Sequence, residues 1–176
     1  IHHRVWKAVI ALAVFLGVLY ALGGMAALAC GVGGAALARV WIETFNYFQH
    51  YGQVRLAGKP IARRHVWNHL KPISRITAFE ITNHADHHLD AYIPYFKLKP
   101  DTNSVKLPSV FVCFLSALIP PLWHKLVIMP ALKEWDLNYA SAEERVLARE
   151  QNRKAGWPDW IGESESATSA GGAVPA

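Results

Sequence analysis

The hydrophobic and polar positions divide the chain into a long uncharged N-terminal part and a mixed remainder. No charged residue occurs over Ala8–Ala38, a run of 31 residues that would be about 46 Å long as one helix. A hydrocarbon core of about 30 Å needs fewer residues than that, and Gly23–Gly24 interrupts the run near its middle. We therefore expect a transmembrane helical hairpin over residues 1–52, with spans at about Val5–Leu22 and Met25–His50.

A single kinked helix is the alternative, since glycine is common within membrane helices. Basic residues flank the apolar run on both sides, and a hairpin would bring all of them to one side, as the positive-inside rule prefers. They are Arg4, Lys7, Arg39, Arg55, Lys59, Arg63 and Arg64. The pattern predicts an all-α integral membrane protein with its later helices on the cytoplasmic side.

Residues 53–135 are predicted to form a cytoplasmic or interfacial region of helices and loops. The pattern indicates one helix there from about Ser74 to Leu89. The apolar stretch Leu107–Met129 is broken by Pro120–Pro121. We expect an interfacial or re-entrant element at this stretch, because it is too interrupted for an ordinary span.

The C-terminal part of the chain is more polar. Residues 136–161 are predicted to form a cytoplasmic helix, in which Ser141 and Glu144 have the spacing of a capping box. Residues 162–176 are rich in Ser, Ala, Gly and Glu, and we expect a disordered tail there.

Composition and charge support the membrane interpretation. Hydrophobic residues make up 52% of the 176-residue chain, and its net charge of +5 suits anionic lipid headgroups. Nucleic-acid binding is not expected, because no motif of interleaved basic and aromatic residues occurs. Cys30 and Cys113 lie in apolar runs and have no nearby cysteine. Neither a disulfide nor a cysteine metal site is expected from them.

Histidine spacing gives the most specific chemical prediction. His84, His87 and His88 stand at positions i, i+3 and i+4, so one helix face can present all three imidazoles to one site. His50 lies earlier in the chain, at the end of the second predicted span. Neutral imidazole is a common ligand for mid-row transition metals. A solvated helix that happens to be rich in histidine is the alternative, but His50 favours a metal site.

Three polar residues near these histidines are candidates for supporting them. Glu80 precedes His84 by one turn and could accept an imidazole N–H or bind the metal itself; a charge that faces solvent is the alternative. Asp86 lies off the histidine stripe and suits a supporting or capping role. Asn46 precedes His50 by one turn and could orient its ring, although helix packing explains it equally well.

A second histidine pair is a weaker candidate for metal binding. His65 and His69 are also four residues apart, but they fall in a short segment after a loop. The HExxH motif of zinc metalloproteases is absent, so a metalloprotease is not supported.

Two stretches resemble a known family. Asn46–Gly52, with the sequence NYFQHYG, resembles the NYxEHYG signature of the membrane-bound alkane hydroxylases and xylene monooxygenases. His84–His88, with the sequence HADHH, resembles their third histidine box, HSDHH. The resemblance extends from about residue 5 to residue 135 and includes Trp67–Asn68 and the stretch after Leu107–Pro108.

The resemblance implies two non-haem iron ions bound almost wholly by histidines, with His50, His84, His87 and His88 among the ligands. It implies O2-dependent hydroxylation of a terminal methyl group in an apolar substrate, an alkane or an alkyl-aromatic compound. Electrons would come from rubredoxin or a ferredoxin-type donor. The spans would lie in a bacterial inner membrane, surrounded by membrane lipid.

This chain departs from the family pattern at three places. Gln49 stands where the signature has Glu, and Asn83 stands where the alkane hydroxylases have Arg. The first two histidine boxes of the family are missing. The chain therefore resembles the C-terminal half alone, and an N-terminal half of the same enzyme would supply the other histidines.

Two other functions stay open at this point. A membrane fatty-acyl desaturase or hydroxylase uses similar histidine boxes, although the NYFQHYG stretch favours the hydroxylases of hydrocarbons. A non-catalytic subunit of a membrane complex could also keep its histidines for haem, copper or zinc. Iron content and O2-dependent product formation would separate the three.

Overall fold

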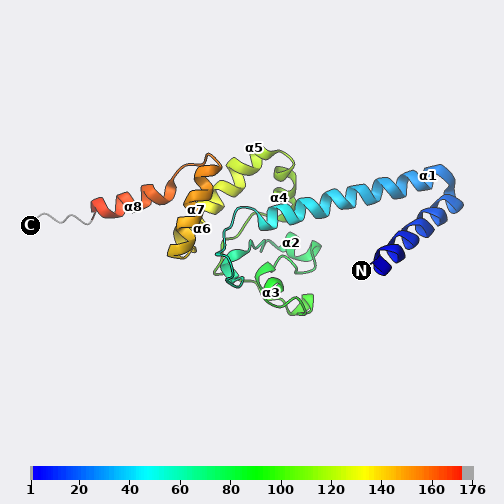
Figure 1. Cartoon of the computed structure of the whole chain (residues 1–176), viewed down its shortest axis with the longest axis horizontal. Coiled ribbons are helices and arrows are strands. Elements are labelled where there is room, and N and C mark those ends of the chain that lie inside the picture. Colours follow the sequence, from blue (N-terminus) through cyan, green and yellow to red (C-terminus); the bar gives the residue numbers. More distant parts are fainter. Residues whose placement is uncertain (1, 172–176) are drawn as a thin grey trace, which may run out of the picture. The chain divides into compact units, whose positions relative to one another are not determined.

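The computed structural model describes residues 2–171, and these are helical with connecting loops (Figure 1). The predicted all-α class is confirmed, because the β pairing within this range is one isolated bridge between Asn68 and Lys106. The chain forms two compact units, which divide between Glu43 and Thr44. Each unit is described by itself below.

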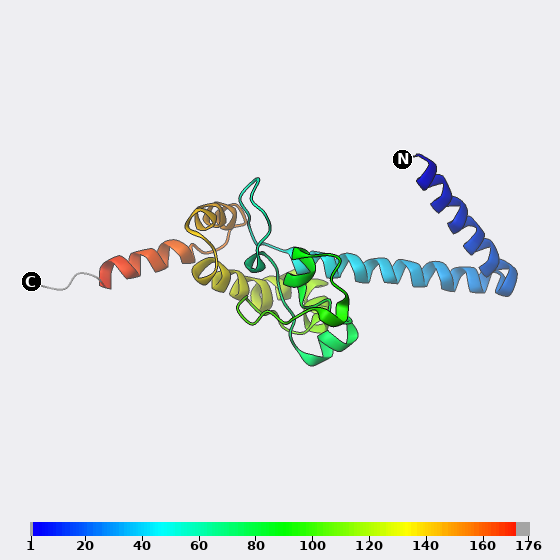
Figure 2. The same ribbon diagram turned by 90° about the horizontal axis from the view of Figure 1, so that it is seen from below.

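The long helix α1, His2–His50, is broken at the glycine pair that the sequence singles out. Gly24 has φ 62° and ψ −151°, a conformation that is essentially restricted to glycine. The first arm turns back at this break (Figures 1 and 2), and Leu19 packs directly over Gly31, so closely that a side chain at Gly31 would collide with it. By length and composition, Arg4–His50 is one helix in the described range that could cross a membrane.

The second unit begins with the last turns of α1 and continues through short helices. They are η1 (Arg63–His65), α2 (Pro72–Thr77), α3 (His84–Leu89), η2 (Tyr95–Lys97), α4 (Val110–Ala117), α5 (Pro120–Leu122), the π-helical η3 (Trp123–Ile128), α6 (Met129–Asn138), α7 (Ala142–Lys154) and α8 (Trp160–Gly171).

Large aromatic side chains form the centre of this unit. Trp67, Trp123 and Trp135 are fully buried, and Phe48 from the end of α1 packs among them, with its ring centroid 6.2 Å from that of Trp123. Burial of such side chains stabilises a fold by about 1.5–3 kcal/mol each. The end of α1 is thereby fixed to η3, and this contact determines where His50 lies.

The predicted single helix from Ser74 to Leu89 is wrong. The chain forms α2 and α3 instead, and the turn between them contains Phe79 and Glu80 in left-handed conformations, with φ 47° and 61°. The Glu80 N–H donates to the carbonyl of Arg75 at 2.8 Å, and the two side chains pair at 2.8 Å. This local ion pair stabilises the turn, so Glu80 does not continue a helical stripe with the histidines.

The interruption predicted at Pro120–Pro121 is confirmed. Helix α4 ends at Ala117, and α5 begins at Pro120, where the missing N–H costs no helical hydrogen bond. One side of this stretch is buried at Trp123, while apolar side chains on the other side are exposed. The exposed ones include Val112, Leu115, Leu118, Ile119, Leu122 and Leu126.

The C-terminal predictions are only partly correct. The predicted helix over residues 136–161 is divided among the end of α6, α7 and the start of α8, although the capping box of Ser141 and Glu144 is confirmed. The predicted disordered tail is helical as far as Gly171. Trp160 explains this, since its ring is buried and its Nε1 donates to Asp136 at 2.7 Å, which anchors the first turn of α8. Residues 172–176 of the predicted tail lie outside the described range.

Candidate metal centre

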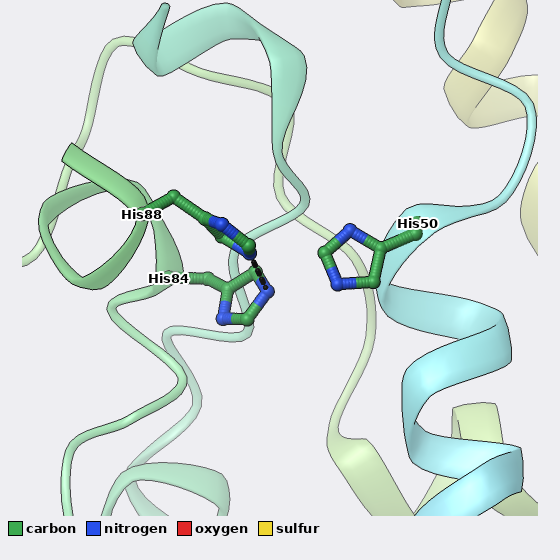
Figure 3. A group of neighbouring side chains, drawn as sticks. All are labelled: His50, His84 and His88. Atoms are coloured by element: carbon green, nitrogen blue, oxygen red, sulfur yellow. Dashed lines mark hydrogen bonds between the residues drawn. The ribbon is translucent and has the colours of Figure 1, made fainter. Parts of the chain in front are cut away.

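His50 is the last residue of α1, and the glycine two positions later explains why the helix ends there. Gly52 has φ 82°, and a Cβ atom at this position would lie 2.5 Å from Cδ1 of Leu132. Only glycine therefore fits the turn without a shift in the chain. The turn leaves the imidazole of His50 exposed at the helix end, where it faces α3 (Figure 3).

The histidines of α3 complete a cluster with His50. His84 is buried and His88 is half-buried, and they lie one turn apart on the same face of α3. Their Nε2 atoms are 2.8 Å apart, and the ring of His50 stands opposite both (Figure 3). The ring centroid of His50 is 5.2 Å from that of His84 and 4.9 Å from that of His88. One ring nitrogen from each of the three lies within 4.8 Å of the others.

The donor set and its spacing fit a transition metal. Metal–imidazole bonds of about 2.0–2.1 Å place neighbouring ligand nitrogens about 2.8–3.4 Å apart in octahedral or tetrahedral sites. The nitrogens of His84 and His88 are already near that separation. Among the described residues, Nδ1 of His84 is buried without a hydrogen-bond partner. A proton on Nδ1 would leave the Nε2 lone pair facing His88 and His50.

The electrostatics keep these imidazoles neutral. Burial, together with the smaller effects of the neighbouring His88 and His50, lowers the pKa of His84 to about 3. Burial also lowers the pKa of His88, with contributions from His50 and His87. Neutral imidazole is the form with a free lone pair, so near neutral pH the cluster can bind a cation without first losing protons.

His87 lies close to the cluster but is outside the group of three nitrogens. Its ring centroid is 5.9 Å from that of His84 and 5.7 Å from that of His88. The structure therefore brings together three of the four histidines predicted as ligands, and His87 stands beside them on the same helix.

The carboxylates predicted to support the histidines have other partners. Glu80 pairs with Arg75 and accepts a hydrogen bond from Asn83 at 2.7 Å. Asp86 pairs with Arg63 at 2.6 Å and accepts the backbone N–H of Lys99 at 3.0 Å. The partners of Glu80 lie within five positions of it, whereas those of Asp86 lie 13 or more positions away. A supporting role of either carboxylate toward the histidines stays a prediction.

Asn46 is exposed, and within the described residues no hydrogen bond joins its side chain to His50. Its predicted orienting role is therefore not seen in the structure. The Asn46 side chain is instead exposed on the surface of α1.

His65 and His69 are not brought together as a ligand pair. His65 uses both ring nitrogens, since Nδ1 accepts the N–H of Ala62 at 3.0 Å and Nε2 donates to Glu144 at 2.7 Å. His69 is fully buried, with Nδ1 2.7 Å from the carbonyl of Pro108 and Nε2 3.0 Å from the amide of Gln49. The two histidines belong to separate hydrogen-bond networks, which leaves neither ring free for a metal.

Sequence patterns assigned no role to two buried polar residues next to the cluster. Asn68 accepts hydrogen bonds from the first N–H groups of α3, and Gln49 precedes His50 and contacts His69. Helical spacing could not reveal either contact, since each joins residues 16 or more positions apart.

Comparison with protein families gives one match over most of the chain. The family model described as fatty acid desaturase matches residues 1–107, which include His50, His84 and His88.

Individual relatives are oxygenases by name. The chain is 44% identical over 163 residues to the xylene/toluene monooxygenase hydroxylase component XylM of Pseudomonas putida, a match over 93% of this chain and 44% of that protein. It is 30% identical over 157 residues to alkane 1-monooxygenase 1 of Pseudomonas aeruginosa, over 86% of this chain and 40% of the relative. The chain thus spans less than half the length of these relatives. No solved structure matches it.

Proposed function

Because the chain belongs to the fatty acid desaturase family, in its group of xylene and alkane monooxygenases, we propose that it is part of a membrane non-haem iron monooxygenase. The observation that carries this proposal is the meeting of His50 with His84 and His88 around one small volume. Two sequence-distant elements supply these imidazoles, and such convergence of neutral, partly desolvated nitrogens has metal binding as its simplest purpose.

His50, His84 and His88 would hold one iron ion, and His87 would contribute to a second. The position of His87 supports this division. It lies outside the group of three, but its ring centroid is 5.9 Å from that of His84 and 5.7 Å from that of His88. Iron bound there would supply the redox chemistry by which one oxygen atom of O2 enters a C–H bond. The remaining ligands would come from the N-terminal half of the same enzyme, which the relatives' greater length leaves room for.

The residues around the cluster have tasks that the geometry supports. The buried face of α3 excludes water from His84, which keeps its lone pair available. The exposed ring of His50 leaves the opposite side of the cluster open. Apolar substrate would approach on this open side.

The membrane arrangement is part of the same proposal. The two arms of α1 would form a hairpin in a bacterial inner membrane, with the break at Gly23–Gly24 at the far surface and the metal centre on the cytoplasmic side. The break at Gly24, the uncharged run of α1 and the basic residues at both ends support this. Lipid would cover the apolar surface of both arms.

A terminal methyl group of an alkane or an alkyl-aromatic compound is the proposed point of attack. The names of the relatives, which include xylene, toluene and alkane monooxygenases, support these substrate classes. Rubredoxin or a ferredoxin-type protein would deliver electrons. Exposed lysines at Lys59, Lys97, Lys99 and Lys106 could attract such an acidic carrier, and its association would then weaken as salt increases.

Fatty-acyl desaturation or hydroxylation is the second candidate, because the matching family model carries the desaturase description. Oxygen labelling separates the candidates. Membranes that contain the protein and its electron donor would be given 18O2 with p-xylene, octane or a fatty-acyl substrate, and the products analysed by mass spectrometry.

We expect an alcohol that carries one 18O atom from xylene or octane, and none from the His50→Ala variant. His124→Gln is the matched control, because His124 lies outside the histidine cluster. A new double bond without 18O would support the desaturase instead. Bound metal with no O2-dependent product from any of these substrates would favour the non-catalytic subunit.

A further inference from the structure

Asn68 is a fully buried residue whose side chain is aimed at the start of α3. Its Oδ1 accepts the N–H of His84 at 3.0 Å and the N–H of Ala85 at 3.4 Å. The side-chain Nδ2 of Asn68 donates to the hydroxyl of Ser104 at 2.6 Å. The backbone carbonyl of Asn68 accepts the N–H of Leu107 at 2.9 Å. Both polar atoms of this side chain therefore have hydrogen-bond partners, and two of the bonds go to the histidine helix.

Helix α3 needs such an external partner. It has six residues, and isolated helices of this length do not persist in water. The first N–H groups of any helix lack partners within the helix. Asn83, at the N-cap position, makes no capping bond with its side chain. Asn68 supplies the missing acceptor from a segment 16 residues earlier in the chain.

His69, the next residue, makes a corresponding contact with the last turn of α1. Its Nδ1 donates to the carbonyl of Pro108, which leaves Nε2 as an acceptor 3.0 Å from the side-chain amide of Gln49. Nε2 of Gln49 has no partner as placed, so an amide turned by 180° would donate to His69. Gln49 directly precedes His50, and the bond therefore ties the end of α1 to the same dipeptide.

We propose that Asn68 and His69 are positioning residues of the metal centre, which together set the distance and angle between His50 and the His84–His88 pair. The inference rests on the proposed function, because it assumes that these three histidines bind a metal. Neither residue touches the metal. One holds α3 by its N-terminus, and the other holds the last turn of α1.

The test is metal binding by the protein isolated in its membrane-embedded form, with Co(II) and Fe(II) as probes. Co(II) gives visible absorption bands whose positions and intensities report the geometry of its ligands. Asn68→Leu keeps the size of the side chain but removes its acceptor and donor. Residues that orient metal ligands typically contribute about 10- to 100-fold to metal affinity, so we expect a loss of that size together with a changed Co(II) spectrum.

Three further variants make the result specific. Asn68→Asp keeps an acceptor for α3, and the Ser104 hydroxyl can turn to donate to the new carboxylate. This variant should therefore show the wild-type Co(II) spectrum. His69→Leu should also weaken binding, through Gln49. Asn152→Leu is the matched structural control, because Asn152 is a buried asparagine bonded to Asp136 at 2.8 Å and far from the cluster. It should lower thermal stability while the Co(II) spectrum stays unchanged.

The outcomes separate the inference from the function on which it rests. Wild-type affinity and an unchanged spectrum in Asn68→Leu would overturn the inference alone. Should that variant fail to fold, Asn68→Ser, which keeps a shorter acceptor, must show a partial loss of affinity, and wild-type binding there would overturn the inference as well. A wild-type protein that binds neither probe, or binds them equally well after His84→Ala, would overturn the proposed function and the inference with it.

Discussion

The carboxylate of Glu144 lies 2.7 Å from Nε2 of His65, across 79 residues of sequence. The same carboxylate accepts two hydrogen bonds from Arg64, at 2.9 and 3.0 Å, and its side chain is 3% exposed. The buried carboxylate of Glu144 therefore links η1 to the first turn of α7. Through this contact His65 stabilises the fold, and both of its ring nitrogens are engaged away from the candidate metal centre.

The acid stability of the protein should depend on Glu144. Although burial raises its pKa, the Arg64 guanidinium, the Ser141 N–H and His65 lower it from 4.5 to about 2. A carboxyl whose pKa is depressed in the folded state stabilises that state above its unfolded pKa, and the effect disappears as pH falls toward the folded pKa. We expect Glu144→Gln to reduce the free energy of unfolding by about 1–3 kcal/mol at pH 6.

The amide oxygen of Gln at this position can keep the capping box with Ser141, while its NH2 group cannot accept from Arg64 and His65 as the carboxylate does, so the loss reports the charge together with these hydrogen bonds. Denaturant unfolding of the metal-free protein at several pH values measures it. The difference between wild type and variant should shrink as pH falls from about 4.5 to about 2. A difference that stays constant across this window would show that the carboxylate carries no such coupling.

Loss of a cluster histidine should affect metal content more than stability. We expect His84→Ala to lower iron affinity by at least about 100-fold, the upper range for residues that merely orient ligands. Iron per protein, measured by plasma mass spectrometry, checks this. His65→Gln provides the comparison, since it should cost stability and leave iron content close to wild type. Equal iron loss in both variants would contradict the assignment of His84.

His87 should behave differently from its neighbours. Because it lies outside the three-nitrogen group, we expect His87→Ala to remove iron from the second position, whereas His88→Ala should remove it from the position shared with His50 and His84. Iron stoichiometry and Mössbauer spectra of the two variants show which of the two positions is lost in each. If His87→Ala keeps all of its iron, the second position is not built on this residue.

Sequence patterns succeeded where the structure depends on local spacing. The break at Gly23–Gly24 follows from two adjacent glycines, and the shared face of His84 and His88 follows from the helical repeat. The patterns failed at Glu80, because a left-handed backbone at a residue other than glycine has no signature in hydrophobic periodicity. They gave no indication of the contacts of His65 and Asn68, whose partners lie many residues away and are determined by packing.

The contact between the two arms of α1 can be tested at Gly31. Leu19 packs against this glycine, whereas Gly34 on the same arm has open space around it. We expect Gly31→Leu to lower the melting temperature in detergent by several degrees, which corresponds to the about 1–3 kcal/mol typical of overpacking. Gly34→Leu should have little effect. Equal effects of the two substitutions would mean that the arms do not pack at this point.

The proposed hairpin makes a prediction about membrane sides. In a protein whose Cys30 has been replaced by Ser, a cysteine introduced by Leu22→Cys should react with an impermeant thiol reagent from the side opposite to Lys59→Cys. Both positions are exposed in the structure, and Cys113 is buried and should stay silent. Labelling of intact and opened cells gives the two accessibilities. Reaction of both cysteines from the same side would exclude the hairpin.

The small size of α3 constrains the order of events during synthesis. Ser104 and Leu107, which hold Asn68 in place, leave the ribosome after the histidines do, and the core around Trp67 is completed only by Trp123 and Trp135. A six-residue segment cannot hold its own helical shape before then. The nascent histidines therefore emerge without a defined arrangement, and under the proposed function iron insertion would be a late, post-translational step that requires the later helices to be in place.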